Sequence, residues 1–313
     1  MTQINFGICF SKDFVGNDPL GHIGVKLPVY LRLLEICKEQ GWGVYVLTRK
    51  TYQGNNIFKG LWRFENGKFN IIDDEVKVDL IYDRTGGVGF PPKDELGLKV
   101  FNNHEFKILC WDKWAGYEEV GEYMPKTFWV GDKDGLHKVL PKIKTDWIVL
   151  KPFNGLKGIG IFIGPKEEAI NFEFMGKKPK YIAQEFLDTS RGIPGITSGL
   201  HDLRVAIVNR KVVWCHIRIP QEGTFKANAA QGGNLTEIDY QRIPDSIKEI
   251  VNKVIPKFAE RYDNPSYSLD FGIGRDGVPK IFEINDQIGF PQWEMKNRDI
   301  FLRELVESFK EKV

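Results

Sequence analysis

A run of alternating residues decides the fold of this chain: Asp270-Phe271-Gly272-Ile273-Gly274-Arg275-Asp276-Gly277-Val278-Pro279-Lys280-Ile281-Phe282-Glu283-Ile284-Asn285. Apolar and polar residues alternate on both halves, which is typical of β-strands. Between the halves, Asp276-Gly277 is typical of a two-residue hairpin turn. The stretch therefore predicts a β-hairpin in which Arg275 pairs with Val278.

This predicted register places two carboxylates opposite one another. Counting back from the turn, Asp270 faces Glu283 and Ser268 faces Asn285, with all four side chains on one face. Directly opposed carboxylates have Cβ atoms roughly 5 Å apart and repel each other unless a positive group lies between them. Carboxylate and amide oxygens are ligands that suit Mg²⁺. The same spacing also fits a solvated outer face, so the hairpin alone leaves both interpretations open.

Composition places the chain among ordinary globular proteins. It has 313 residues, enough for about two domains, with 42% hydrophobic residues, 27% charged residues and a net charge of +2. Four cysteines lie far apart without C-x-x-C spacing, which fits reduced thiols in a cytosol. The N-terminus lacks a signal-peptide pattern, and no apolar run approaches the ~20 residues of a membrane span. We therefore expect a cytoplasmic protein without nucleic-acid or membrane partners, and a homo-oligomer is compatible with the sequence.

The first hundred residues have the pattern of an α/β unit. Apolar runs at 4–10, 43–47 and 78–82 predict strands, and helical spacing predicts a helix over 29–40 that ends before Gly41. Strand, helix and strand in this order predict a right-handed βαβ unit with a small parallel sheet. Residues 52–76 are interpreted as a hairpin or an insertion.

The remaining residues have the pattern of hairpins packed on helices. A loop that enters a strand is predicted over 124–130. Strands are predicted at 147–151, 159–163, 181–186, 203–208 and 211–218, with a tight turn at Asn209-Arg210. Helices are predicted at 102–119, 133–140, 243–262 and 298–310. The change from a parallel to a hairpin pattern places a boundary near 102–125, so the fold class is α/β plus α+β.

A glycine cluster follows the strand at 147–151. Gly155, Gly158 and Gly160 let the backbone approach an anion closely. Rossmann and P-loop fingerprints require a helix directly after their glycines, whereas β-branched residues follow here. The loop is therefore predicted to be a glycine-tipped hairpin, flanked by Lys151 and Lys157, that could cover phosphates. An ordinary flexible hairpin explains the same pattern.

A series of short motifs follows along the chain: Lys113, Pro125-x-Thr127, Lys151 to Gly160, Gln184 to Leu187, Asp202-Leu203-Arg204-Val205, Phe225-Lys226-Ala227-Asn228 with Gly232-Gly233, and Asp270 with Glu283-Ile284-Asn285. In this order, the motifs resemble the ATP-grasp superfamily of carboxylate–amine ligases, closest to the glutathione synthetase and ribosomal-protein glutamate ligase branches. The resemblance implies a small N-terminal parallel α/β domain (1–102) followed by a two-subdomain ATP-grasp fold, with the glycine flap in 103–190 and the metal hairpin in 191–313.

The resemblance also implies a nucleotide site between the two subdomains. Residues expected to contact ATP are Lys113, Lys151, Gly155, Lys157, Gly158, Gly160, Gln184, Glu185, Phe186, Leu187 and Asp188. Among these, Lys113 and Lys151 would hold the phosphates. Backbone groups of Glu185 and Leu187 would contact the adenine, and Asp188 would contact the ribose.

Metal ligands and phosphoryl-neutralising groups follow from the same resemblance. Asp270, Glu283 and Asn285 would bind two Mg²⁺ ions, for which Mn²⁺ could substitute. Arg204, Arg218 and Lys226 would neutralise the transferred phosphoryl group. Lys226 stands where such enzymes more often carry arginine, and lysine lacks the bidentate fork.

The implied activity is formation of an amide bond from a carboxylate and an amine, with ATP converted to ADP and phosphate. Phosphoryl transfer depends on positioning and charge neutralisation, so no Ser–His–Asp set is required. The five histidines lack metal-binding spacing, and His201 beside Asp202 is the one that we would test.

Substrates are expected to be small-molecule or peptide carboxylates and amines. Arg84, at the end of a predicted parallel strand, is suited to bind a carboxylate, although a salt bridge in a turn explains it equally well. Residues 289–293 are expected to border the acyl site. Two alternatives stay open: a phosphotransferase on the same scaffold, and a non-catalytic nucleotide-binding protein of the spore-coat type.

Overall fold

The computed structural model of the protein describes residues 3–14, 18–88, 90, 98–155, 158–176, 180–221, 223–225 and 234–313. Four sheets and seven α-helices are assigned within these residues. No helix among them has the length and apolar character needed to cross a membrane.

A six-stranded sheet with the order β6-β5-β2-β1-β8-β9 forms the N-terminal part. β1 pairs in parallel with both β2 and β8, which confirms the predicted βαβ unit. The predicted insertion supplies the antiparallel β5–β6 hairpin and a small sheet of β3, β4 and β7. The bounds are β1 Asn5–Phe10, α1 Leu27–Glu39, β2 Gly43–Thr48, β3 Tyr52–Gly54, β4 Ile57–Phe58, β5 Leu61–Glu65, β6 Lys68–Ile72, β7 Val76–Lys77, β8 Leu80–Arg84 and β9 Lys99–Phe101.

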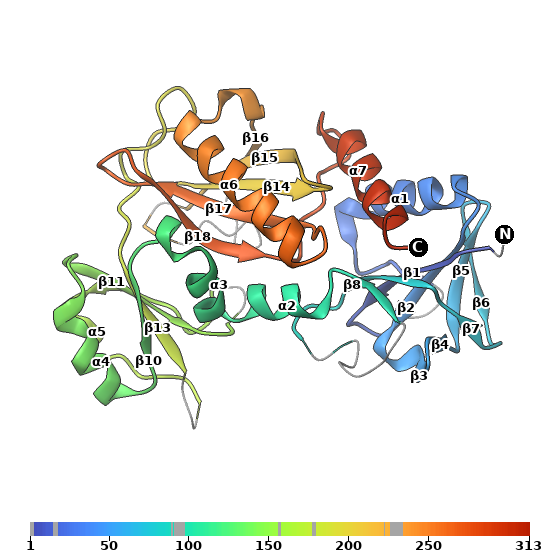
Figure 1. The fold of residues 1–313 in the computed structure, drawn as a ribbon, viewed down its shortest axis with the longest axis horizontal. Helices are drawn as coiled ribbons and strands as arrows, with labels where there is room; N and C mark the ends of the chain where they lie inside the picture. The colour runs from blue at the N-terminus through green and yellow to red at the C-terminus, as the bar shows by residue number, and fades with distance from the viewer. Residues whose placement is uncertain are drawn as a thin grey trace.

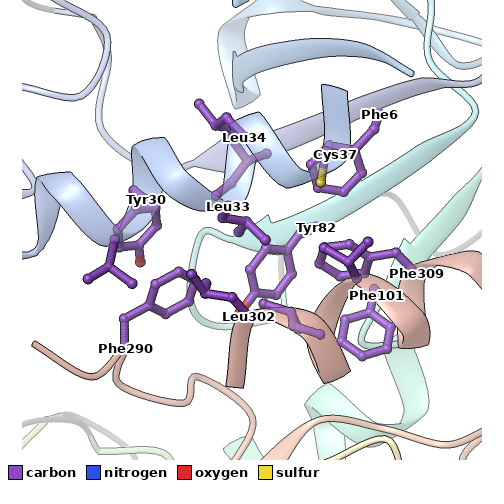
Figure 2. Packing of buried hydrophobic residues seen from close by; sticks show 14 of the residues in the cluster. Phe6, Tyr30, Leu33, Leu34, Cys37, Tyr82, Phe101, Phe290, Leu302 and Phe309 are labelled. Carbon is purple, nitrogen blue, oxygen red and sulfur yellow. The ribbon is translucent and has the colours of Figure 1, made fainter. Parts of the chain in front are cut away.

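The C-terminal helix α7 (Arg298–Lys310) returns to this N-terminal sheet and lies beside α1 (Figure 1). Its Phe309 packs against Phe6, Tyr82 and Phe101, with ring centroids 4.9 to 5.2 Å apart (Figure 2). Phe290, which follows the metal hairpin, stacks on Tyr30 of α1 at 4.1 Å. The shared core therefore attaches the end of the chain to its beginning.

Two short helices lead from the N-terminal part to the rest of the chain (Figure 1). α2 (His104–Trp111) and α3 (Lys113–Val120) replace the single helix predicted over 102–119. Asp112 lies between them, and its carboxylate accepts hydrogen bonds from the backbone N–H groups of Trp114 and Ala115 at 2.9 and 3.2 Å. This N-cap starts a new helix, and Lys113 becomes its first residue.

A four-stranded antiparallel sheet with the order β10-β13-β11-β12 contains the glycine loop. Helices α4 and α5 pack against it, around a core that includes Leu136, Ile148 and Leu150. The predicted hairpin is confirmed, but β12 begins at Phe162 rather than 159 because Gly158 and Gly160 keep positive φ angles of +72° and +71°. The bounds are β10 Thr127–Val130, α4 Lys133–Val139, β11 Trp147–Pro152, β12 Phe162–Pro165, α5 Lys166–Ala169 and β13 Tyr181–Glu185.

A five-stranded antiparallel sheet with the order β16-β15-β14-β17-β18 carries the metal hairpin. One face presents residues such as Leu203, Val205 and Leu269 to helix α6, forming a single apolar core. The alternate residues, among them Arg204 and Asp270, lie on the opposite face because side chains alternate along a strand. The bounds are β14 Asp202–Val208, β15 Lys211–Ile219, β16 Asn234–Glu237, α6 Asp245–Arg261, β17 Tyr267–Ile273 and β18 Pro279–Asn285.

Candidate active site

The metal hairpin has the predicted pairing at the site and a different pairing at its turn. Asp270 lies opposite Glu283, and Ser268 lies opposite Asn285, as the sequence predicts. The prediction that Arg275 pairs with Val278 was wrong, because Gly274 donates its N–H to the Val278 carbonyl at 3.0 Å instead. The pairing near the turn is therefore shifted by one residue from the prediction. One extra residue on β18 offsets this shift, so that Asp270 still lies opposite Glu283.

That extra residue is Phe282, which forms a β-bulge between the Asp270–Glu283 pair and the Phe271–Ile281 pair. Its ring lies against Gly272, where a Cβ atom would come within 2.3 Å of the ring carbon Cζ. Only glycine leaves this space, so Phe282 reaches the face on which Asp270 lies and borders the cavity described below. Bulges redirect side chains next to functional sites, and the bulge at Phe282 places Glu283 opposite Asp270.

Asp270 is the centre of a buried ion-pair network. Arg204 donates to both of its carboxylate oxygens at 2.6 and 2.7 Å, and Arg218 donates to Oδ2 at 2.8 Å. Arg218 also pairs with Asp202 at 2.5 Å, and the Asn285 amide donates to Asp270 at 3.1 Å. Burial opposes ionisation of Asp270, but the two guanidinium groups hold its pKa well below the ordinary value. Asp270 is therefore ionised and fully hydrogen-bonded.

Asp202 has a different electrostatic environment. Burial first, and then the negative charge of Asp270, raise its pKa to about 6 in spite of Arg218. Its Oδ1 atom is buried without a hydrogen-bond partner among the described residues. The two aspartates therefore differ in proton affinity although they share Arg218.

Lys113 connects the glycine loop to the metal hairpin. Its Nζ atom donates to the carbonyl of Gly155 at 2.7 Å and lies 3.2 Å from the Glu283 carboxylate. The Glu283 side chain is 37% exposed, in contrast to the buried Asp270. Each of the two opposed carboxylates is thus neutralised by its own protein side chains, Glu283 by Lys113 and Asp270 by two arginines.

Lys151 lies deeper, on β11. Its Nζ atom donates to the side-chain oxygen of Gln184 at 2.9 Å, and Gln184 in turn donates to Thr127 at 3.0 Å. Burial lowers the pKa of Lys151 to about 8, although Glu283 acts in the opposite direction. The resemblance placed Gln184 in the adenine hinge, and that role stays a prediction; in the structure its side chain is buried beside Lys151.

The rest of the predicted hinge lies at the end of β13. The backbone N–H of Glu185 donates to Lys126 at 2.9 Å, and its carboxylate accepts the N–H of Lys144 at 2.8 Å. Phe186 donates its N–H to the Thr145 hydroxyl at 3.2 Å. Asp188 pairs with Arg275 at 2.8 Å. These groups are engaged by protein partners.

A small cavity lies where the predicted nucleotide groups meet. It has a volume of about 20 Å³, enough for roughly one water molecule. Lys113, Lys151, Gln184, Glu283 and Phe282 border it, together with apolar residues such as Leu109, Met124 and Ile182. The structure thus brings together Lys113, Lys151 and Gln184 with Glu283. Leu187 lies elsewhere, against the hairpin turn at Gly274, where a Cβ atom would be 3.0 Å from its Cδ1 atom.

Some predicted residues lie outside this arrangement. Lys157 of the flap and Lys226 fall outside the described residues. His201 is a structural residue: its Nε2 atom accepts the N–H of Ile273 at 3.2 Å, and its Nδ1 atom lies 3.1 Å from the Gly199 carbonyl. Among the described residues, no three His, Cys, Asp or Glu side chains converge as a metal site. The predicted set instead combines two carboxylates with the amide of Asn285.

Sequence reasoning missed His216 and the role of Asp202. His216 lies opposite Arg204 on the polar face, is buried, and has no partner for its Nδ1 atom among the described residues. Asp202 and Arg204 on β14, and His216 and Arg218 on β15, are polar residues two positions apart, and this spacing was the available signal. A bulge at Val213, between the pairs Ala206–Trp214 and Ile207–Val212, shifts the register by one residue from that of a simple Asn209-Arg210 hairpin. Counting back from the turn would have placed Cys215 opposite Arg204.

Relatives with curated descriptions match part of the chain, and a family model matches its central residues. Residues 118–257 match the RimK-like ATP-grasp domain. A "Probable alpha-L-glutamate ligase" of Vibrio parahaemolyticus serotype O3:K6 is 27% identical over 114 residues, which are 36% of this chain and 35% of that protein. Its counterpart in Haemophilus influenzae strain PittEE is 28% identical over 148 residues, 45% of this chain and 47% of that protein. The match thus spans between about a third and a half of the length of these relatives.

Solved structures match the whole chain. The D-alanyl-alanine synthetase A from Vibrio cholerae O1 biovar eltor superposes with a TM-score of 0.68 at 13% identity, covering 100% of this chain and 99% of that chain. The RimK domain protein ATP-grasp from Sphaerobacter thermophilus gives 0.60 at 12% identity, covering 97% and 98%. At these identities the likeness concerns the fold. The chain has the fold of the ATP-grasp ligases, and residues 118–257 match the RimK-like ATP-grasp domain.

Proposed function

We propose that the protein is an ATP- and Mg²⁺-dependent ligase that joins a carboxylate to an amine. One observation carries this proposal: Lys113 and Lys151 border the same cavity as Glu283, which pairs with Lys113, and the arginine-paired Asp270 lies directly opposite Glu283 on the same hairpin. Cations and carboxylates in this arrangement suit polyphosphate and metal binding. The match of residues 118–257 to the RimK-like ATP-grasp domain supports the same activity.

The three predicted Mg²⁺ ligands are not equally available to bind the ion. The carboxylate of Glu283 is partly exposed, and Asn285 follows it by two residues on the same strand. Both oxygens of Asp270 already accept hydrogen bonds from Arg204, Arg218 and Asn285. Asp270 would therefore bind a cation only after an arginine leaves its carboxylate. When bound, Mg²⁺ would neutralise the phosphate charge; two ions, with Mn²⁺ as a substitute, are part of the proposal.

The nucleotide would lie between the four-stranded and five-stranded sheets. Because the present cavity holds roughly one water, these sheets would have to separate to admit ATP. Lys113 would then exchange Gly155 and Glu283 for phosphate oxygens, and Lys151, positioned by Gln184, would do the same. Backbone N–H groups of the glycine loop are suited to bind the phosphates.

In the proposed reaction, an oxygen of the substrate carboxylate attacks the γ-phosphorus of ATP, and the bond to the bridging oxygen breaks to release ADP. The amine then attacks the carbonyl carbon of the acyl phosphate, phosphate leaves, and the nitrogen loses a proton. Arg204 and Arg218 are placed to stabilise the charge on the transferred group. Asp270, which pairs with both arginines in the present structure, would then bind Mg²⁺ instead of the arginines.

Thermal unfolding with ATP, with and without Mg²⁺, tests this proposal. A ligand that binds only the folded state raises the melting temperature, so we expect a shift with ATP that grows when Mg²⁺ is added. No shift at millimolar ATP would contradict the proposal. Hydroxylamine separates the ligase from a phosphotransferase, because an acyl phosphate yields a hydroxamate whereas a stable phosphorylated product does not. ATP binding without any ADP release would favour a non-catalytic protein.

A further inference from the structure

A second cavity, of about 390 Å³, lies in the N-terminal part of the protein. Its volume is in the range of pockets that bind small molecules, roughly 300–1,000 Å³. The cavity at Lys113 and Glu283, by comparison, holds roughly one water molecule. Residues that border the second cavity include Ile4, Asn55, Lys77, Asp79, Lys99 and Val313. The proposed ligase reaction uses none of them.

This cavity lies at the end of the N-terminal sheet that is opposite the proposed site. Ile4 precedes β1, Asp79 precedes β8, and Lys99 begins β9. These three strands are parallel neighbours, so the cavity is at their amino ends. The carboxyl end of β8 carries Arg84, which donates to the carbonyl of Ile288 at 3.1 Å, just after the metal hairpin. Figure 1 shows β7, which borders the cavity, at the opposite end of the molecule from β10 and β11.

Hydrogen bonds hold the walls of the cavity in place. Asn5 donates its backbone N–H to Oδ2 of Asp79 at 2.8 Å and its side-chain amide to the carbonyl of Lys77 at 2.9 Å. Asp79 donates its own N–H to the carbonyl of Asn5 at 2.8 Å. Asn55 and Asn56, with φ angles of +51° and +64°, form the two-residue turn between β3 and β4, as asparagine does in type I′ turns. The cavity is therefore framed by backbone in a fixed position.

Two lysines at the cavity have no acidic partner. Among the residues that the structure describes, no carboxylate lies within ion-pair distance of the Lys77 or Lys99 ammonium group, and neither group donates a hydrogen bond. Oδ1 of Asp79 accepts no hydrogen bond within the same residues. A single exposed lysine without a partner is ordinary. Two such lysines that border one cavity, together with a carboxylate that pairs with neither, offer both cations and an acceptor to a ligand.

We propose that this cavity binds a phosphorylated sugar, either free or as part of a nucleoside monophosphate. Lys77 and Lys99 would bind the phosphate, because lysine binds phosphate as a point charge. Asp79 and Asn55 would bind the sugar hydroxyls, because a carboxylate accepts hydrogen bonds and an amide both donates and accepts them. An anion without hydroxyl groups would bring a like charge to Asp79 and give it no donor. The proposal goes beyond the ligase function and does not depend on it.

Calorimetric titration of the full chain with ribose 5-phosphate and with AMP tests the proposal without requiring turnover. We expect at least one of them to bind, and ribose to bind about tenfold more weakly or less, as loss of charged hydrogen bonds does. The double variant Lys77→Gln/Lys99→Gln should lose at least the same factor. Tighter binding of AMP than of ribose 5-phosphate would assign the site to a nucleotide, and equal binding would assign it to a sugar phosphate.

The matched control is Lys59→Gln/Lys68→Gln, which removes two exposed lysines of the same part of the chain that do not border the cavity. It should leave the affinity unchanged, and so should Lys113→Met, which removes a proposed ATP ligand. Asp79→Asn should weaken ribose 5-phosphate and leave the binding of inorganic phosphate unchanged.

Three results would overturn the proposal. The first is that neither phosphorylated compound binds at millimolar concentration. The second is that the Lys77→Gln/Lys99→Gln protein retains full affinity. The third is that Lys113→Met abolishes binding, since the phosphate would then lie in the ATP site. Failure of the ligase proposal appears separately, as absence of the ATP-dependent thermal shift.

Discussion

The two faces of the five-stranded sheet use the same strands in opposite ways. On one face, Leu203, Val205 and Leu269 are fully buried against α6, and their stabilisation follows from apolar area removed from water. On the other face, Arg204 and Asp270 alternate with those residues and are also largely buried. There, each charge is stable only because an opposite charge is within hydrogen-bond distance.

This difference separates what holds the fold from what the site can do. The apolar face tolerates exchange of one aliphatic side chain for another of similar volume. The polar face does not, because removal of one charge leaves its partners buried and unpaired. Substitutions of adjacent residues on one strand should therefore have separable effects on stability and on activity.

Asp270→Asn is expected to have the largest effect. It leaves Arg204 without its carboxylate and Arg218 with Asp202 alone, which should lower the free energy of unfolding by about 3–5 kcal/mol and abolish ADP release. Urea unfolding and an ADP assay measure the two effects. Asp276→Asn at the exposed hairpin turn is the control and should change neither. A fully stable Asp270→Asn protein would show that the network adds nothing to stability.

Leu269→Ala changes the neighbouring residue, which faces α6 and is fully buried. Loss of its side chain should lower the free energy of unfolding by about 2–5 kcal/mol. ADP release per folded molecule should stay unchanged at a temperature where the variant remains folded. Loss of activity without loss of stability would mean that the two faces are not separable.

Stability should also fall as the pH decreases below 6.5, because His201 is buried and uncharged. Burial lowers its pKa, although contacts with Gly199 and Thr189 act in the opposite direction. The unfolded chain therefore binds a proton that the folded protein does not, which gives a slope of at most ~1.4 kcal/mol per pH unit. His216 acts in the same direction, whereas the raised pKa of Asp202 acts in the opposite direction.

The prediction is therefore tested by the difference in the pH dependence of stability between the unsubstituted chain and a variant without His201. Urea unfolding of the unsubstituted chain and of His201→Gln, between pH 5.0 and 7.0, should show a smaller pH dependence in the variant. Equal slopes would mean that His201 becomes protonated in the folded state without cost.

Glu283→Gln should have the smallest effect on stability. The ion pair with Lys113 is partly exposed at 3.2 Å, so its loss should cost less than about 1 kcal/mol. The relief of carboxylate repulsion that the bare hairpin would predict is not expected, because arginines already compensate Asp270. ADP release should fall by at least about 100-fold, as loss of one electrostatic contact in such a site does. Unchanged release would rule out Glu283 as a metal ligand.

Much of the framework could be predicted from the sequence because it depends on local periodicity. Helix α7 over Arg298–Lys310 and the parallel strands β1, β2 and β8 follow from 3.6-residue and continuous apolar patterns. The pairing of Asp270 with Glu283 was predicted correctly, but from a turn that does not form. The error at the turn and the bulge at Phe282 cancel each other.

The two β-bulges could not be predicted from the sequence, because a bulge depends on the residues of the neighbouring strand. Phe282 and Val213 each add one residue between a turn and the polar face. Nothing local marks either position, since Phe282 is accommodated by Gly272 on the neighbouring strand.

By itself, the sequence determined which residue types are present for phosphate, metal and carboxylate chemistry, and in which order. Tertiary structure alone decided their partners: Gln184 beside Lys151, two arginines on Asp270, and Lys113 on Glu283. The physical reason is that charge compensation acts over a few ångströms in space, between residues as far apart in sequence as 113 and 283.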